Sequence, residues 1–426
     1  MAEIHAFRGW RYNKELADPG LVTAPPYDVI DPRGQDYYYR RHPENVIRLI
    51  LGREEAGDNE RANKYTRARG YLDDWRRRGV LVHENTPAVY LYRQDFQVPE
   101  GGRAARSGLI ADLALSPFGE GVVRPHERTL SKPKEDRLRL MRATGFQLSQ
   151  IFMLYEDPDG ALRASLEVRP EEPAADLIDP EGVRHRLWPL TEAGTIDRLR
   201  SFFAPRPVYI ADGHHRYETA LAYRDELQRR GLPLGDAGRV AVVLVDLDQP
   251  GLVVFPTHRA VHALASWDEG AFRRRLEEFF RLVPYEGSPR DLARDVAKQP
   301  HAFGFVFRDA SYKAILADEA AAMAAMPQER APAWRRLDVS LLHSLVLGRI
   351  LGLDDEAQAK QTNLIYTREA DEAAAMTVDG RAQFSVLLGP TPVRQVKDVA
   401  DAGETMPQKS TYFWPKLLSG LVLKEL

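Results

Sequence analysis

The feature that most constrains the fold is a stretch in which a strand-like segment gives way to a helical one at an aspartate and a glycine. Residues 208–211 are apolar or aromatic, Asp212 and Gly213 follow, and apolar residues recur at helical spacing from Tyr217 onward. A strand that breaks at glycine into a helix directs unpaired backbone N–H groups at whatever lies above the turn. The pattern favours a fold in which strands and helices are interleaved.

The side chains of this turn suit phosphate and a metal ion. His214, His215 and Arg216 add donors and positive charge to the backbone N–H groups, and Asp212 supplies a hard oxygen ligand. The alternative is that both histidines are structural and that Arg216 is a solvated charge. Adjacent histidines point in different directions, and packing does not readily explain the Asp-Gly break before them. We therefore interpret residues 212–216 as a functional site.

A second candidate site is the polar loop at residues 123–137, which lies immediately before a predicted helix. Glu127 is our first choice for a general base and Asp212 the second. Positively charged residues of the loop are suited to bind the oxygens of a phosphate group or of a substrate carboxylate. The predicted substrate-binding residues of the loop are Arg124, His126, Thr129 and Lys132. A salt-bridged surface loop is the equally weighted alternative.

A weaker signal lies near the N-terminus, where two prolines precede Tyr27 and Asp28. Prolines fix an extended backbone, which presents the next side chains in a defined direction. We assign both residues to substrate binding, although a structural role is the more common one for such residues. Glu127 and His214 are expected to face one cleft, although about 85 residues separate the two loops in the sequence.

Composition excludes several classes of protein. The 426 residues include no cysteine, which excludes disulfides, thiolate nucleophiles and cysteine-ligated metal sites. The formal net charge of -3 does not favour nucleic acid as a partner. No apolar run is long enough to span a membrane, and residues 1–5 do not resemble a secretory signal, so a cytoplasmic protein is expected. The sequence motifs of P-loop enzymes, dinucleotide folds, zinc proteases and serine hydrolases are absent.

Predicted strands and helices alternate without a strict βαβ rhythm, so the fold class is α/β or α+β with mixed sheets and interleaved helices. We expect an N-terminal α/β region at residues 1–265, which carries both candidate loops, and a C-terminal α/β region at residues 266–426. In the second region, a capping box at residues 266–269 predicts a helix to about residue 280. Apolar spacing predicts another helix at residues 337–351.

Four stretches together resemble the landmark motifs of one large bacterial family, long known only as domain of unknown function 1015. The resemblance runs from about Ile4 to the C-terminus. The stretches are Ala24-Pro25-Pro26-Tyr27-Asp28-Val29-Ile30, Arg124-Pro125-His126-Glu127-Arg128-Thr129, Ile210-Ala211-Asp212-Gly213-His214-His215-Arg216-Tyr217-Glu218-Thr219-Ala220 and Met406-Pro407-Gln408-Lys409-Ser410-Thr411-Tyr412-Phe413.

The Asp-Gly-His-His-Arg turn also resembles the phosphate-binding box of the ParB/sulfiredoxin superfamily, which includes archaeal kinases of free serine. The resemblance implies a nucleotide-binding core of that type and transfer of phosphate from ATP, with Mg²⁺, to free L-serine. Gly213, His214, His215 and Arg216 would then hold the nucleotide phosphates, and Asp212 would hold magnesium or the substrate. Sulfiredoxins need a catalytic cysteine, which this chain lacks. Partition proteins carry a DNA-binding helical domain, for which we find no pattern.

Two other functions remain open at this stage. The histidines and carboxylates of the candidate sites are an adequate ligand set for Zn²⁺ or Mn²⁺ in a metal-dependent hydrolase. A nucleotide-sensing module without turnover is the other alternative. We expect a nucleotide and a small molecule as partners, neither nucleic acid nor a membrane, and allow for a homodimer. The acceptor, the choice of ATP over ADP and the role of Met406–Phe413 are not determined by the sequence.

Overall fold

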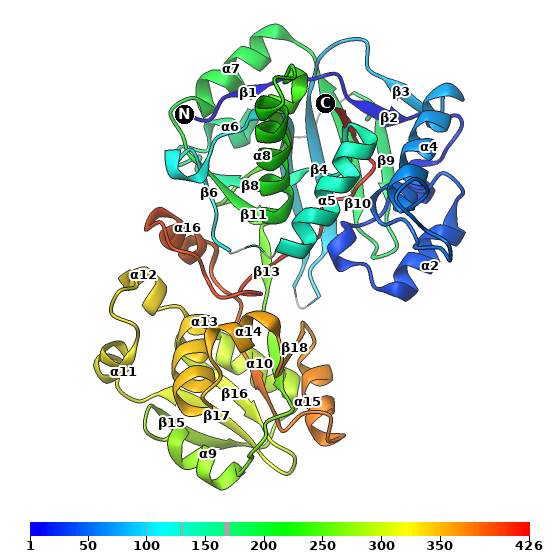
Figure 1. Cartoon of the computed structure of the whole chain (residues 1–426). Coiled ribbons are helices and arrows are strands. Elements are labelled where there is room, and N and C mark those ends of the chain that lie inside the picture. The colour runs from blue at the N-terminus through cyan, green and yellow to red at the C-terminus, as the bar shows by residue number, and fades with distance from the viewer. Residues whose placement is uncertain (100, 128, 130, 166–170) are drawn as a thin grey trace. The chain divides into compact units, whose positions relative to one another are not determined.

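The computed structural model describes residues 1–99, 101–127, 129, 131–165 and 171–426 (Figure 1). These residues form two compact units. Unit 1 consists of Met1–Pro125, Thr129–Leu252 and Pro415–Leu426, and unit 2 consists of His126–Arg128 and Val253–Trp414. Each unit combines a sheet with helices, which confirms the mixed fold expected from the sequence. The domain division between residues 265 and 266 remains a prediction.

Unit 1 is built on a mixed sheet, which has nine strands in the described part of the chain. The strand order is β6-β11-β8-β12-β5-β4-β10-β9, and β1 pairs with β5. The pairs β6–β11 and β8–β12 are parallel, whereas the other described pairs of this sheet are antiparallel. The strands are β1 (Ile4–His5), β4 (Val89–Gln97), β5 (Arg103–Ala114), β6 (Val123–Arg124), β8 (Ile151–Tyr155), β9 (Ala175–Ile178), β10 (Arg184–Leu190), β11 (Val208–Asp212) and β12 (Arg239–Asp246).

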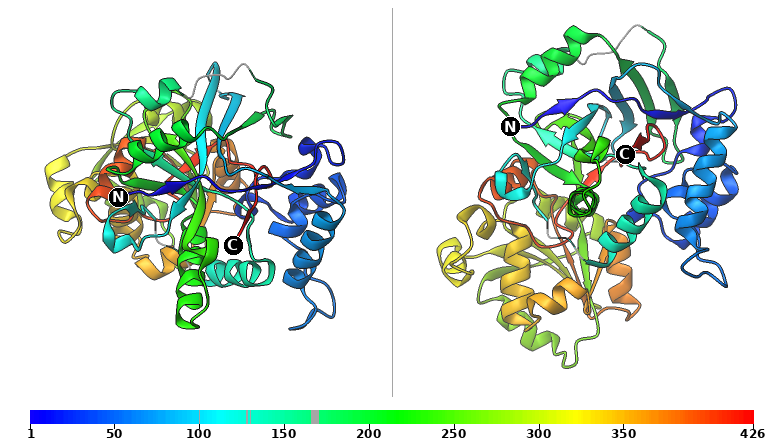
Figure 2. Two further views of the ribbon diagram at one scale, coloured as in Figure 1. Left: turned by 90° about the horizontal axis from the view of Figure 1, so that it is seen from above. Right: turned by 45° about the horizontal axis from the view of Figure 1, so that its top comes forward.

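Helices α5 and α8 lie side by side against this sheet (Figure 2). Helix α8 buries Tyr217 and Ala220 in the same apolar cluster as Ile210 of β11. The Tyr217 hydroxyl donates to the Ser116 carbonyl at 2.8 Å, which fixes the helix beyond the end of β5. The helices of unit 1 are α1 (Pro19–Val22), α2 (Pro32–Arg41), α3 (Ile47–Ile50), α4 (Lys64–Arg77), α5 (Ser131–Thr144), α6 (Ala161–Ser165), α7 (Ala193–Phe203) and α8 (His214–Arg229), with 3-10 turns at Tyr27–Val29, Phe118–Glu120 and Gly235–Gly238.

Two small sheets attach the chain ends to unit 1. Strand β2 (Trp10–Tyr12) pairs with β3 (Leu81–His83), and β21 (Lys424–Glu425) pairs with β7 (Phe146–Gln147). Lys424 is buried, and its Nζ lies 2.6 Å from Oδ1 of the buried Asp112. Burial lowers the pKa of Lys424 and raises that of Asp112, while each charge opposes the shift of the other. The pair therefore ties the C-terminus to the central sheet.

We expect Lys424→Met to lower the free energy of unfolding by about 3–5 kcal/mol, because the change leaves a buried carboxylate without this partner. Urea unfolding followed by circular dichroism measures the loss. Lys298→Met is the matched control: its pair with Asp295 spans a similar 2.8 Å but is exposed, so the expected loss is below about 1 kcal/mol. Equal losses in the two variants would contradict a structural role for the buried pair.

The sheet of unit 2 is antiparallel throughout its described pairs, in the order β15-β17-β16-β19-β14-β18. Its strands are β14 (His258–Val261), β15 (Phe280–Tyr285), β16 (Ala302–Val306), β17 (Ser311–Leu316), β18 (Leu364–Thr367) and β19 (Phe384–Leu387), and β13 (Val253–Phe255) pairs separately with β20 (Tyr412–Trp414). The helices are α9 (Glu269–Leu276), α10 (Pro289–Ala297), α11 (Glu319–Ala325), α12 (Pro332–Arg335), α13 (Asp338–Leu341), α14 (Asp355–Lys360), α15 (Ala370–Val378) and α16 (Val393–Asp401).

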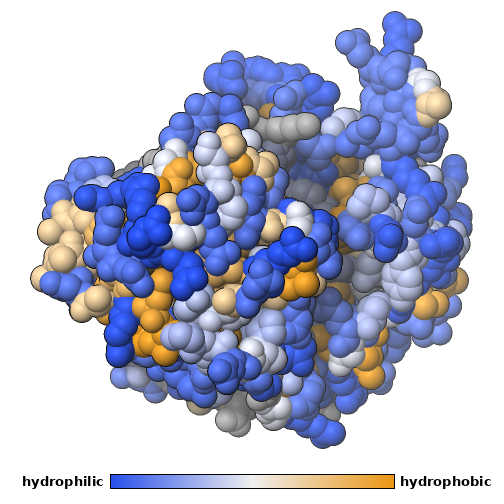
Figure 3. Space-filling model, turned by 90° about the horizontal axis from the view of Figure 1, so that it is seen from below, coloured by the Kyte–Doolittle hydropathy of each residue, from blue (hydrophilic) through white to orange (hydrophobic). Residues whose placement is uncertain are grey.

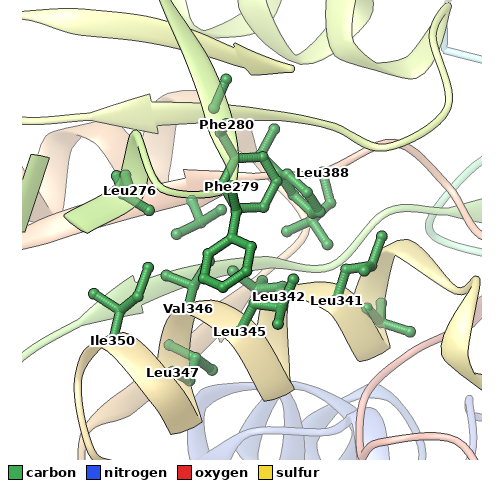
Figure 4. Packing of buried hydrophobic residues seen from close by; sticks show 14 of the residues in the cluster. Leu276, Phe279, Phe280, Leu341, Leu342, Leu345, Val346, Leu347, Ile350 and Leu388 are labelled. Carbon is green, nitrogen blue, oxygen red and sulfur yellow. The ribbon is translucent and has the colours of Figure 1, made fainter. Parts of the chain in front are cut away.

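The core of unit 2 forms where one face of its sheet meets the helical segment at residues 338–350 (Figure 4). Leu342, Leu345 and Val346 pack in the same cluster as Phe280 and Leu388. The helix expected at residues 337–351 is present, but residues 342–350 form a π-helix after α13.

The helix expected between the capping box at residues 266–269 and about residue 280 is shorter in the structure, where it covers Glu269–Leu276. Its N-cap is Asp268, whose side chain accepts from the Ala271 N–H at 2.9 Å. The helix, α9, stops at Leu276 because strand β15 begins at Phe280. Pairing between β15 and β17 thus limits a helix that local spacing would have continued.

Across the described residues, no helix combines the length and the apolar character needed to cross a membrane. The face of the molecule drawn in Figure 3 is mainly hydrophilic, and its hydrophobic residues lie in small separate groups.

Candidate functional site

The turn between β11 and α8 has the conformation that its sequence indicates. Gly213 adopts φ 96°, a left-handed conformation that disfavours other residues, and is the N-cap of α8. A Cβ at this position would lie 2.9 Å from Nε of Arg216, so the guanidinium covers the glycine directly. Because glycine has no side chain to cap the helix, the first N–H groups of α8 are not covered by its N-cap residue.

Asp212 ends β11 and faces two cations. Its Oδ2 accepts from Nζ of Lys416 at 2.8 Å, and its Oδ1 lies 3.7 Å from Nη2 of Arg216. Burial on its own would raise the pKa of Asp212, but Lys416 and Arg216 outweigh it and lower the pKa well below its ordinary value. The carboxylate is therefore ionised at neutral pH.

Arg216 joins this turn to the neighbouring strand. Its Nη1 donates to the carbonyl oxygen of Gln150, just before β8. Its Nε is buried and has no hydrogen-bond partner among the described residues. An incompletely satisfied guanidinium at a helix N-terminus is suited to an anion with several oxygen acceptors, such as a phosphate group.

Lys416 is the residue of this turn that the sequence analysis missed. It comes from the C-terminal segment of unit 1, whose carbonyl groups are held by buried side chains of the central strands. Gln94 Nε2 donates to the Lys416 carbonyl at 2.9 Å, and Arg106 Nη2 donates to the Pro415 carbonyl. Nothing in the local sequence indicates that Lys416 would meet an aspartate 204 residues earlier.

The two histidines of the turn differ in exposure. His214 is buried, and its charge, when present, lowers the pKa of Asp212. His215 is partly exposed, and its carbonyl accepts from the Thr219 hydroxyl at 2.7 Å within the helix. Both lie in the first turn of α8, as expected, and their predicted contacts with phosphate remain a prediction.

Three residues of the polar loop lie in unit 1, on elements next to the β11–α8 turn. Strand β6 runs parallel to β11 with Arg124 opposite Tyr209, so both strands end on the same side of the sheet. Thr129 donates its hydroxyl to Glu218 of α8 at 2.8 Å. Lys132 lies in the first turn of α5, and its side chain is outside the described part of the structure.

Tyr27 and Asp28 lie in the 3-10 turn at Tyr27–Val29. Tyr27 lines a cavity of unit 1 together with Arg216, whereas Asp28 is exposed. Burial raises the pKa of Tyr27 to about 12, against the lowering effect of Arg137 and Arg216. Tyr27 is thus close to Arg216 of the phosphate turn, whereas the sequence predicted it only as a weak candidate for substrate binding.

The other members of the polar loop belong to unit 2. Glu127 forms a parallel bridge with Met406, and the His126 carbonyl accepts from the Met406 N–H at 2.8 Å. The buried His126 ring also lies 3.2 Å from the Thr411 hydroxyl. The Met406–Phe413 motif, whose role the sequence left open, therefore holds the loop that carries Glu127.

A buried polar cluster lies close to Glu127 in unit 2. Arg259 is almost fully buried, its guanidinium lies 5.2 Å above the Tyr366 ring, and its Nη2 is 3.5 Å from His343 Nε2. Burial and Arg259 lower the pKa of His343 to about 3, so this histidine is neutral. Glu127 adds to the raised pKa of Tyr366, which places its charge near the cluster.

Glu127 lies in unit 2 and His214 in unit 1, so the expectation that they share one cleft remains a prediction. Among the described residues, no three or more His, Asp or Glu side chains gather as a metal site would require. The ligand set expected for a zinc or manganese hydrolase is therefore not assembled within that part of the chain. A magnesium ion bound mainly by phosphate oxygens needs only one or two carboxylates.

Comparison with known proteins identifies a family over most of the chain. The model of the family described as "Protein of unknown function (DUF1015)" matches residues 4–340. No curated protein matches the chain.

Several solved structures are similar to the chain at low identity. A conserved hypothetical protein from Pyrococcus furiosus is 15% identical, with 71% of this chain and 90% of that chain covered and a TM-score of 0.34. A free serine kinase in complex with AMP is 14% identical, with 71% and 86% covered and a TM-score of 0.37. SbnI from Staphylococcus aureus, truncated at its C-terminus, is 10% identical, with 71% and 83% covered and a TM-score of 0.35.

Proposed function

The chain belongs to the DUF1015 family, and from this premise we propose that it is an ATP-dependent kinase of a free hydroxyl amino acid. The proposed acceptor is L-serine, and the product is O-phosphoserine. The observation that carries the proposal is the turn from β11 into α8, where Gly213 and the guanidinium of Arg216 meet at the start of a 16-residue helix. The choice of L-serine as the acceptor rests on the resemblance of this turn to the phosphate-binding box of free-serine kinases.

The geometry supports phosphate binding for two physical reasons. The N-terminus of a helix offers N–H groups and a partial positive charge to an anion. Arg216 and Lys416 add two full positive charges beside it, while Asp212 compensates for one of them. The excess of positive charge suits a polyphosphate rather than a neutral ligand.

Magnesium fits the proposed site through Asp212. The lowered pKa keeps this carboxylate ionised, and Mg²⁺ commonly takes one or two carboxylates together with phosphate oxygens. When bound, the ion would neutralise charge on the transferring phosphate. Asp212 would hold the ion, and Arg216 would orient the phosphates that share it.

In the proposed reaction, the serine hydroxyl oxygen forms a bond to the γ-phosphorus of ATP, and the bond from that phosphorus to the β,γ-bridging oxygen breaks. ADP leaves, and the hydroxyl proton passes to a carboxylate, for which we propose Glu127. Positioning and charge neutralisation account for most of the rate in such transfers. The carboxylate of the acceptor needs a cation, for which Arg124 or Lys132 is proposed.

Phosphorus NMR tests the proposal directly. Purified protein with ATP and Mg²⁺ is incubated with L-serine, L-threonine, homoserine or glycerol, and the expected result is a phosphomonoester resonance together with ADP in the L-serine sample. A parallel series with ADP as the donor identifies the nucleotide used. Arg216→Ala protein purified in the same way controls for a contaminating kinase and is expected to give little product.

Other outcomes would reject the kinase. Release of inorganic phosphate at the same rate with and without an acceptor would indicate a hydrolase. Tight nucleotide binding with no product from any hydroxyl compound would indicate a sensing module.

A further inference from the structure

An open cavity lies in unit 1 beside the first turns of α8, with about 490 Å³ of empty space that includes open solvent. Arg216 and Thr219 of α8 form one wall, and α5 forms another through Arg137 and Met141. The remaining walls are mainly apolar and include the buried Val240. The cavity belongs to unit 1 alone and adjoins the proposed phosphate turn.

One side chain belongs to both the turn and the cavity. The guanidinium of Arg216 covers Gly213 and lies 3.7 Å from Asp212, and the same residue lines the cavity. Its buried Nε lacks a partner in the described structure. A ligand that placed anionic oxygens at the turn would therefore have its uncharged part directed at the cavity.

Tyr27 lines the cavity in contact with Arg137 of α5. The Arg137 guanidinium lies 3.9 Å from the centre of the Tyr27 ring. Arg137 is itself held by Asp136 and by the Ile50 carbonyl, to which its Nη1 donates at 2.6 Å. With its pKa raised to about 12, Tyr27 keeps its phenol proton at physiological pH and presents a neutral aromatic surface.

We propose that this cavity holds the nucleobase of the nucleotide whose phosphates bind at Gly213–Arg216. The inference rests on the proposed function and deepens it. A flat heteroaromatic ring gains from aromatic and apolar walls and needs few hydrogen bonds. The ammonium and carboxylate of serine would lose their hydration against Met141 and Val240 without compensation. Tyr27 therefore serves the nucleotide, rather than the acceptor to which the sequence analysis assigned it.

Calorimetry on the unmodified protein separates the base from the phosphates. Titration with ADP and with inorganic pyrophosphate is expected to show ADP binding about 10-fold or more tightly, since stacking and burial of the base add to the phosphate contacts. Equal affinities would overturn the inference while leaving phosphate binding intact. If neither compound bound, the proposed function would fail as well, so the two failures are distinguishable.

Two variants test the walls. Tyr27→Ala removes the aromatic surface, and Ser149→Trp fills the cavity from a partly exposed wall. Each is expected to weaken ADP binding about 10-fold and to leave pyrophosphate binding unchanged. Tyr37→Ala and Ser201→Trp are matched controls at exposed positions of α2 and α7, and we expect both to bind ADP normally.

The outcomes of the variants are decisive because the phosphate probe reports on folding. A variant that has lost its fold loses pyrophosphate binding too, and the other variant then decides. Normal ADP affinity in a folded Tyr27→Ala or Ser149→Trp protein would overturn the assignment of the cavity.

Discussion

Glu127→Gln is expected to lower kcat about 10²–10⁴-fold with little change in nucleotide affinity. Glutamine keeps the shape of the side chain but cannot accept the hydroxyl proton. Steady-state kinetics of O-phosphoserine formation measure kcat, and calorimetry with ADP measures affinity. Glu120→Gln is the matched control, because this glutamate accepts from the Ser116 hydroxyl and takes no part in the proposed reaction.

We propose Glu127 rather than Asp212 as the base because of the cations around Asp212. Asp212 accepts from Lys416 at 2.8 Å and lies near Arg216, and the pKa lowered by these cations makes it a weak proton acceptor. If Glu127→Gln kept near-normal turnover while Asp212→Asn abolished it, the base would be Asp212. The loop that carries Glu127 would then act in binding alone.

Arg216→Ala is expected to weaken ADP binding about 10–150-fold, because a charge-assisted contact contributes about 1.5–3 kcal/mol. Calorimetric titration measures the affinity, and circular dichroism checks that the variant is folded. Arg224→Ala is the matched control on the same helix, since Arg224 also donates to a backbone carbonyl, that of Leu115, at 2.9 Å.

Arg216→Lys distinguishes charge from shape. Lysine keeps the charge but cannot span the Gln150 carbonyl and the Asp212 carboxylate at once, so a partial recovery of affinity is expected. Unchanged ADP affinity in a folded Arg216→Ala protein would remove this residue from the site, and the phosphate turn would have to be reassigned.

Local sequence was sufficient for elements whose conformation depends on neighbouring residues. The Asp-Gly break produced a strand that ends at Asp212 and a helix that begins at His214, because glycine readily adopts the left-handed conformation the turn requires. The mixture of strands and helices followed in the same way. The helix after residue 266 was misjudged because strand pairing at Phe280 limits its length.

The sequence by itself determined the conformation of the turn at residues 212–216, since the residues that define it are adjacent in the chain. Only the tertiary structure brought Lys416 to Asp212, joined Glu127 to Met406, and placed Tyr27 and Arg216 on the walls of one cavity. These contacts depend on how strands far apart in the sequence pair and on which buried side chains hold the returning C-terminus. The spacing of residues along a chain carries no direct record of such pairings, because burial and strand pairing are settled by the packing of the whole unit.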